Sequence, residues 1–110
     1  MALYQTSLTI PPNTPEGAPA EVILKPGVGN IRSIEILFPD GCLGLVGVKI
    51  MDENNPIAPL PSGWLRDNNK TIAWAENRRL QGPPYRLVIH GISYAIDWPH
   101  TIEVRMEITK

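Results

Sequence analysis

Cysteine and histidine, which act as nucleophiles, bases and metal ligands near neutral pH, are scarce in this chain. The chain has one cysteine, Cys42, and two histidines, His90 and His100. Neither histidine has a neighbour at the H-x-x-H, H-x-E or H-E-x-x-H spacing that places two ligands on one ion. We therefore expect two surface or hydrogen-bonded histidines, and we expect no metal site.

The single cysteine is a candidate nucleophile. A catalytic thiol needs a partner base and an electropositive setting. His90 or His100 could supply that base, so a small hydrolase built around Cys42 or the two histidines is one hypothesis. A buried structural cysteine is the commoner case and the one we favour. We expect no catalytic residue and no enzyme activity, and a lone cysteine excludes an internal disulfide.

Two clusters of acidic and amide side chains place oxygen ligands close together, at 52–55 (DENN) and 67–69 (DNN). Neither cluster has the glycine and terminal glutamate that complete a calcium loop. Turns rich in Asp and Asn explain both. The segment 25–30, KPGVGN, has a G-x-G alone and falls between two predicted strands, which is not the setting of a phosphate-binding loop. We expect no cofactor.

The tryptophans are the best candidates for contact with a ligand. Trp64 and Trp98 fall in predicted loops, whereas Trp74 shares a strand face with Ile72 and is expected in the core. Exposed aromatic rings on a β-sandwich can stack on sugar rings, so a carbohydrate-binding module that uses Trp64 and Trp98 is a second hypothesis. Tryptophans in proline-rich loops more often pin the loop to the end of the domain, and we favour that role.

Composition and charge limit the classes of partner. The chain has 110 residues, of which 43% are apolar and 19% charged, with a net charge of -1. These values are typical of one globular domain and give no electrostatic case for nucleic acid or an anionic membrane. The N-terminus lacks the basic and apolar regions of a signal peptide. No apolar run approaches the roughly 20 residues that span a bilayer. We expect synthesis in a cytoplasm.

Alternation of polar and apolar residues predicts β-strands along most of the chain. The clearest strand covers 101–109, where an apolar residue occupies every second position from Ile102 to Ile108. This strand should lie at or near the centre of its sheet, with its apolar row in the core and Glu103, Arg105 and Glu107 toward solvent or a partner. The same alternation predicts further strands upstream: 4–10, 21–25, 33–38, 46–50, 71–75 and 85–90.

The strand pattern predicts an all-β fold, a single-domain antiparallel β-sandwich of about seven strands, of jelly-roll or immunoglobulin-like type. We expect little or no helix, since the best helical window, 73–81, allows one turn. We divide the chain into 1–19, an N-terminal strand or arm with a proline-rich spacer, and 20–110, the β-sandwich domain. Prolines should make 11–19 stiff, and the arm could pair with its own sheet or a neighbour's. The segment 52–66 is expected to wrap the surface as a long loop.

Two segments, 38–50 and 83–108, are similar to small β proteins encoded among the structural genes of tailed bacteriophages. The resemblance covers about a third of the chain. It is carried by these turn-and-strand motifs: Phe38-Pro39-Asp40-Gly41, Gly44-Leu45-Val46, Pro84-Tyr85 and Pro99-His100-Thr101-Ile102. It implies a non-enzymatic virion component made in the host cytoplasm, foremost a capsid decoration or cement protein that binds the major capsid protein and stabilises the particle. A tail, connector or fibre module is the alternative.

A lattice protein of this kind is expected to self-associate, and we favour a trimer. Its partner surface should use apolar groups that a monomer would struggle to hide. The residues that we expect to contact partners lie in the arm and in the loop 52–66: Tyr4, Leu8, Ile10, Ile57, Leu60 and Trp64.

Overall fold

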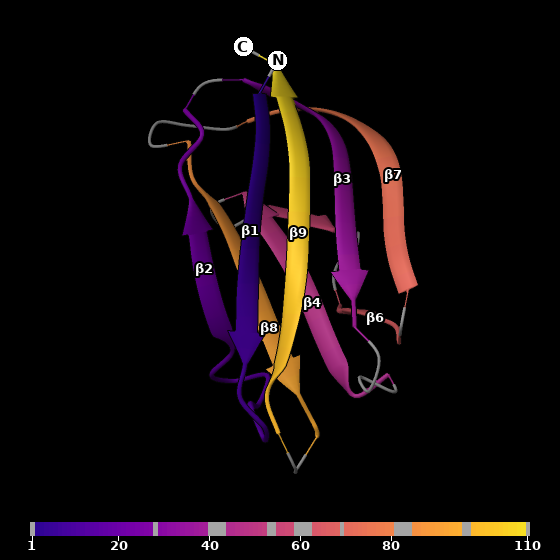
Figure 1. The fold of residues 1–110 in the computed structure, drawn as a ribbon. Helices are drawn as coiled ribbons and strands as arrows, with labels where there is room; N and C mark the ends of the chain where they lie inside the picture. The colour runs from indigo at the N-terminus through magenta and orange to yellow at the C-terminus, as the bar shows by residue number, and fades with distance from the viewer. Residues whose placement is uncertain are drawn as a thin grey trace.

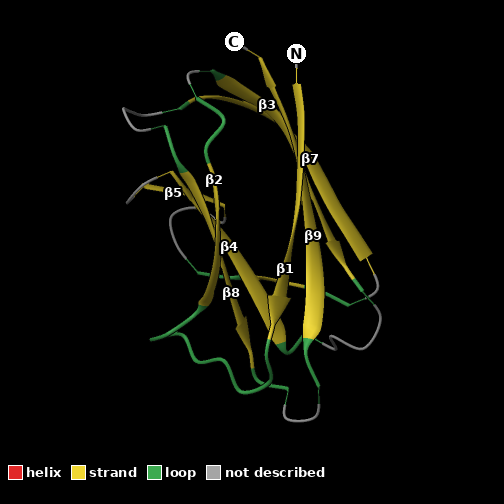
Figure 2. Ribbon diagram, turned by 60° about the vertical axis from the view of Figure 1, so that its left-hand side comes forward, coloured by secondary structure: helices red, strands yellow, loops and turns green. Residues whose placement is uncertain are grey.

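The chain folds into β-strands joined by turns and loops (Figure 2). The computed structural model describes residues 2–27, 29–39, 44–52, 55–58, 63–68, 70–80, 85–95 and 98–109. No helix occurs among these residues. The strands are β1 (Ala2–Ile10), β2 (Ala20–Leu24), β3 (Asn30–Phe38), β4 (Val46–Asp52), β5 (Asn55–Ala58), β6 (Leu65–Arg66), β7 (Lys70–Arg79), β8 (Leu87–Ser93) and β9 (His100–Thr109).

The strands form two antiparallel sheets that face each other (Figure 1). The first sheet has the order β1-β9-β3-β7, and the second has the order β2-β8-β4-β5, with β6 also paired to β4. The predicted all-β sandwich is therefore confirmed. The described residues form nine strands where about seven were expected, because the segment 52–66, predicted to be a long loop, contains β5 and β6.

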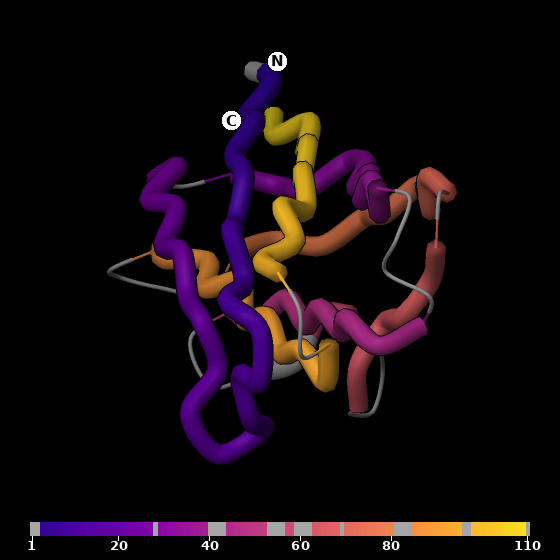
Figure 3. The backbone as a smooth tube through the Cα atoms, turned by 60° about the horizontal axis from the view of Figure 1, so that its bottom comes forward, coloured from indigo at the N-terminus to yellow at the C-terminus, as the bar shows by residue number. Residues whose placement is uncertain are grey.

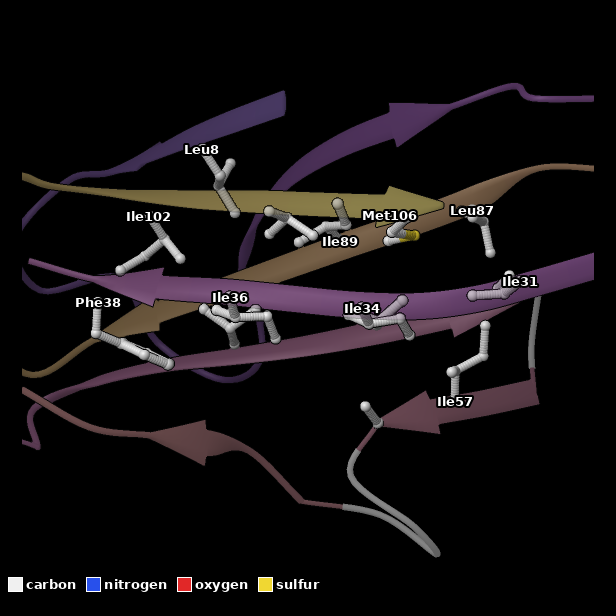
Figure 4. Packing of buried hydrophobic residues seen from close by; sticks show 14 of the residues in the cluster. Leu8, Ile31, Ile34, Ile36, Phe38, Ile57, Leu87, Ile89, Ile102 and Met106 are labelled. Carbon is white, nitrogen blue, oxygen red and sulfur yellow. The ribbon is translucent and has the colours of Figure 1, made fainter. Parts of the chain in front are cut away.

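The final strand lies where its sequence places it. β9 pairs with β1 on one side and β3 on the other, so it is central in its sheet. All four members of its apolar row are buried: Ile102, Val104, Met106 and Ile108. Figure 4 shows Ile102 and Met106 among core side chains from both sheets, including Ile36 and Ile89.

The segment that allowed a helical turn is a strand. β7 pairs with β3 from Asn30 opposite Arg79 to Phe38 opposite Lys70, with an irregularity between Ile31 and Ser33. Tertiary pairing decides the outcome, because alternation of Ile72 and Trp74 with alanines suits a half-buried strand. Trp74 is half-buried and packs against the core.

The N-terminal strand belongs to its own sheet. β1 pairs with β9 along its whole length, from Ala2 opposite Ile108 to Ile10 opposite His100. Leu8 and Ile10 are buried in the core. The sequence left open whether this strand pairs with its own sheet or with a neighbour's. In this structure it pairs with its own sheet. The premise that a monomer would struggle to hide Leu8 and Ile10 is wrong.

Gly91 on β8 allows β1 to pack this closely. A Cβ added at Gly91 would lie 2.7 Å from Cγ1 of Ile10 and 2.9 Å from Cδ2 of Leu8. We expect Gly91→Ala to lower the free energy of unfolding by about 1–3 kcal/mol, as overfilled cores do. Urea unfolding measures the change. Gly17→Ala is the matched control, because nothing lies within 4 Å of its added Cβ, and equal stability of the two variants would contradict this packing.

The segment 11–19 is not extended. The backbone N–H of Asn13 donates to the carbonyl of Ala95 at 2.9 Å, and that of Ser93 donates to the carbonyl of Thr14 at 3.0 Å. The hydroxyl of Thr14 donates back to the carbonyl of Pro11 at 2.6 Å. Asn13 adopts a left-handed conformation with φ of 57°. The segment predicted to be a stiff spacer therefore folds against the end of β8.

Candidate functional site at one end of the sandwich

Several loops meet at the end of the sandwich drawn at the bottom of Figure 1 and brought forward in Figure 3. The segment 11–19 follows β1 there, and the turn 94–99 joins β8 to β9. The backbone N–H of Tyr94 donates to the carbonyl of Leu45, just before β4, at 2.9 Å. Backbone hydrogen bonds thus fix the positions of these loops relative to each other.

Three large apolar side chains are exposed at this end. Leu45, Tyr94 and Trp98 have exposed fractions of 39%, 46% and 66%. We call these three residues the loop-end surface. The other exposed large apolar side chains among the described residues are Leu3 on β1 and Ile23 on β2. Exposed aromatic and aliphatic groups gathered at one end are typical of a binding surface.

Trp64 packs on the outer face of the second sheet, next to this surface. Gly47 on β4 pairs with Ile92 on β8. A Cβ added at Gly47 would lie 3.0 Å from Cβ of Trp64 and 3.1 Å from Cγ1 of Ile92. Glycine at 47 therefore lets the tryptophan lie against the strand. Ile92 is fully buried, although it alternates with the core-facing Gly91 and so belongs to the outer face.

One carboxylate ties the loops together. The indole N–H of Trp64 donates to Oε1 of Glu16 at 2.8 Å, and the hydroxyl of Tyr94 donates to Oε2 at 2.7 Å. Two cations cover the rings: Nζ of Lys49 lies 4.4 Å from the centroid of Trp64, and Cζ of Arg66 lies 5.1 Å from that of Tyr94. Both distances suit cation–π contacts. We call these five residues the Glu16 cluster.

The cluster lowers the pKa of the Glu16 carboxyl. The hydrogen bond from Tyr94 is the largest cause and that from Trp64 the next, and the positive charges of Arg66 and Lys49 act in the same direction. Both hydrogen bonds favour the ionised carboxylate. A lowered pKa in the folded state means that ionised Glu16 stabilises the fold above its unfolded-state pKa. That contribution is lost as the pH falls through the folded-state pKa.

Acid should therefore release Trp64. We expect the fluorescence of Trp64 to change at a pH below about 4.3, the ordinary pKa of glutamate, as Glu16 takes up its proton. The transition should be missing from an acid titration of Glu16→Gln and of Trp64→Phe. A Glu16→Gln variant that keeps the same transition would show that other carboxyls cause it.

The two histidines lie in different sheets, and His90 pairs directly with Lys49 of the Glu16 cluster. His90 on β8 has its Nδ1 3.6 Å from Oε1 of Glu21, and burial lowers the pKa of His90, with the charge of Glu21 opposing that shift. His90 is therefore mainly neutral at pH 7, and the contact is not an ion pair. His100 on β9 is buried opposite Ile10. Cys42 lies outside the described residues. Within the described ranges, no three His, Cys, Asp or Glu side chains are grouped to hold a metal ion.

The structure disperses most of the predicted partner residues. Leu8, Ile10 and Ile57 are buried. Tyr4 is half-buried, and its hydroxyl donates to the carbonyl of Pro26 at 3.4 Å. Leu60 lies outside the described residues. The monomer therefore buries Ile57, as it buries Leu8 and Ile10.

The two loop tryptophans divide between the roles proposed for them. Trp64 acts as the expected staple, since it is half-buried, hydrogen-bonded to Glu16 and covered by Lys49. A ring that already carries a cation offers less surface for a sugar, which weakens the carbohydrate hypothesis at Trp64. Trp98 is exposed, so its ring is available to a sugar or to a protein partner.

Sequence reasoning missed Glu16, Leu45 and Tyr94. Glu16 lies 48 residues from Trp64 and 78 from Tyr94, so no local pattern could join them. One signal was present, since Glu16 is the only charged residue of the segment 11–19.

The described part of the chain holds no helix long and apolar enough to span a membrane.

Comparison with known proteins gives a likeness in fold. No protein-family model matches the chain, and no curated protein sequence matches it. Among solved structures, the chain is similar to a chain in the X-ray structure of tomato aspermy virus. The TM-score is 0.50 and the identity 13%, over 98% of this chain and 78% of the other. At this identity the likeness shows the fold alone, a β fold of the kind present in a virus structure.

Proposed function

We propose that the protein is a non-enzymatic structural component of a virus particle. The observation that carries the proposal is the likeness in fold to a chain of tomato aspermy virus, over 98% of this chain. The sequence resemblance to small β proteins of tailed bacteriophages supports the same class. The side chains of the Glu16 cluster hold loops against a sheet. Each of its charged groups, Glu16, Lys49 and Arg66, contacts an aromatic residue of the cluster, and these contacts suit a structural role.

Within this class, we propose capsid decoration, in which the loop-end surface binds the major capsid protein. Trp98 and Tyr94 supply exposed aromatic rings. Arg66 lies over the ring of Tyr94, and Lys49 lies over the ring of Trp64. Aromatic anchors next to a polar rim are the usual anatomy of a protein interface. Hydrogen bonds hold Tyr94 in place before binding, so little conformational entropy is lost on docking.

The test is the protein content of purified particles of the virus whose genome encodes this chain. We expect the chain in a fixed ratio to the major capsid protein in intact particles. Separated heads and tails decide between decoration and a tail, connector or fibre module, because a decoration protein stays with the heads. Absence of the chain from purified particles would overturn the proposal. Binding of the free protein to a polysaccharide through Trp98 would then favour the carbohydrate hypothesis.

A further inference from the structure

The strand β7 is a long edge of the first sheet. It has ten residues, Lys70–Arg79, and pairs with β3 alone. Figure 1 shows it at the margin of the sheet, with no described strand beyond it. Along its outer side, the backbone N–H and C=O groups that point away from β3 pair with no strand of the described residues. Such an edge is a ready template for another strand.

The other edges are better protected. β1 lies beside β2, the edge of the opposite sheet, and the hydroxyl of Tyr4 reaches the carbonyl of Pro26 across that margin. β5 has four residues and includes Pro56, and β6 has two. Short strands and prolines are the usual protection of sheet edges. β7 has neither feature, so it is the edge best suited to pairing.

The side chains of β7 match those of a second β7. Lys70, Ile72, Trp74 and Glu76 alternate on one face of the strand. In an antiparallel pair centred on Ala73, Lys70 of each copy lies opposite Glu76 of the other. Ile72 lies opposite Trp74 in the same way. Each two-fold pair therefore gains two unlike-charge contacts and two aliphatic–aromatic contacts, both favourable cross-strand combinations.

Neighbouring registers match less well. Centring the pair on Trp74 would place Lys70 opposite Arg78, two like charges, and Ile72 opposite Glu76. Centring it on Ala75 would place Ile72 opposite Arg78. Like charges directly opposite each other destabilise a sheet. The register centred on Ala73 also uses the regular part of β7, because the pairing irregularity with β3 falls beyond Ala75.

Pairing would also bury apolar surface that the monomer leaves half-covered. Ile72 and Trp74 pack against the core but keep intermediate exposure. The side chain of Lys70 is 66% exposed, and its Nζ lies 3.9 Å from Oδ2 of Asp67. An exposed ion pair of this kind is weak, so the ammonium group can exchange Asp67 for a carboxylate of a second copy. Glu76 accepts the indole N–H of Trp74 through Oε2, and a carboxylate has a second oxygen for a lysine.

We propose that two copies of the chain associate through β7, antiparallel and centred on Ala73, and so join two four-stranded sheets into one. Such a two-fold contact is self-complementary and closed. It would give a dimer in place of the trimer that we favoured from the sequence. The pairing does not depend on a role in a virus particle, since it uses the edge of the sheet and not the loop-end surface.

Charge reversal tests the pairing on the full chain by sedimentation equilibrium over a range of concentrations. We expect a wild-type dimer, and we expect Lys70→Glu and Glu76→Lys each to raise the dimer dissociation constant at least tenfold by opposing like charges. The double variant restores unlike pairs and should recover the dimer. A monomeric wild-type chain, unchanged dissociation constants in the single variants or a double variant that stays monomeric would each overturn the proposal.

Oxidative cross-linking gives a second measurement if a charge variant is poorly folded. In a Cys42→Ser background, Ala73→Cys should form a disulfide-linked dimer, because directly opposite residues of an antiparallel pair lie about 4.5–5.5 Å apart between Cα atoms. Ala75→Cys lies on the same face but opposite Thr71 in this register, and should stay unlinked. Equal cross-linking of both variants, or of neither, would contradict the register.

Discussion

Replacing Ile92 with alanine should lower the free energy of unfolding by about 2–5 kcal/mol, the cost of emptying a buried aliphatic site. Ile92 has no exposed surface even though it lies on the outer face of its sheet. Trp64 lies against the same strand pair over Gly47, and we infer that it covers Ile92. Loss of the isoleucine should therefore leave a cavity beneath the tryptophan and shift the fluorescence of Trp64.

Ile23→Ala is the matched control for this variant. Ile23 is the same residue type on β2 of the same sheet, but its exposed fraction is 44%. We expect its replacement to change the free energy of unfolding by less than about 0.5–1 kcal/mol. Urea unfolding followed by circular dichroism compares the two variants. Similar losses would show that Trp64 does not cover Ile92 in solution.

Replacing Trp98 with alanine should weaken binding to the capsid about thirtyfold or more. This is the effect of losing about 2 kcal/mol at an interface hot spot, where tryptophans are enriched. Among the large apolar side chains that the structure describes, Trp98 has the largest exposed fraction, 66%, so its removal leaves no cavity and should spare the fold. The measurement is rebinding of the purified variant to particles produced without the gene for this chain.

Leu3→Ala is the control for binding. Leu3 is exposed to nearly the same extent as Trp98, 65% against 66%, but it lies near the N-terminus, at the opposite end of β1 from the loops (Figure 1). Its replacement should leave the affinity unchanged. Weaker binding of Leu3→Ala with normal binding of Trp98→Ala would move the contact surface to the other end of the sandwich.

Period-two alternation predicted the fold class because it is a local property that two packed sheets impose on each strand. It located β9 and its buried row, and it located β1, β3, β4 and β8 closely. It failed at β5 and β6, which are too short to show a period and form by pairing with β4. Little or no helix was expected, and the helical turn that the sequence allowed within 73–81 does not form in the described residues 73–80, because pairing with β3 outweighs local propensity.

The sequence indicated which tryptophans belong to the candidate site, but it did not indicate their contacts. Trp64 and Trp98 stand out by residue type, but their different roles depend on what lies next to each ring. Lys49 and Glu16 reach Trp64 from a strand and a loop distant in sequence, and nothing local predicts that contact. Gly47 was a usable signal, because a glycine inside a strand often marks the close approach of another group.

The role of the loop-end surface is tested most directly by a difference map, from cryo-electron microscopy, between normal particles and particles produced without this chain. We expect density for a β-sandwich at regular positions on the capsid lattice, with Tyr94 and Trp98 turned toward the shell. Absence of difference density on the shell, or density bound through the end that carries the two termini, would contradict it.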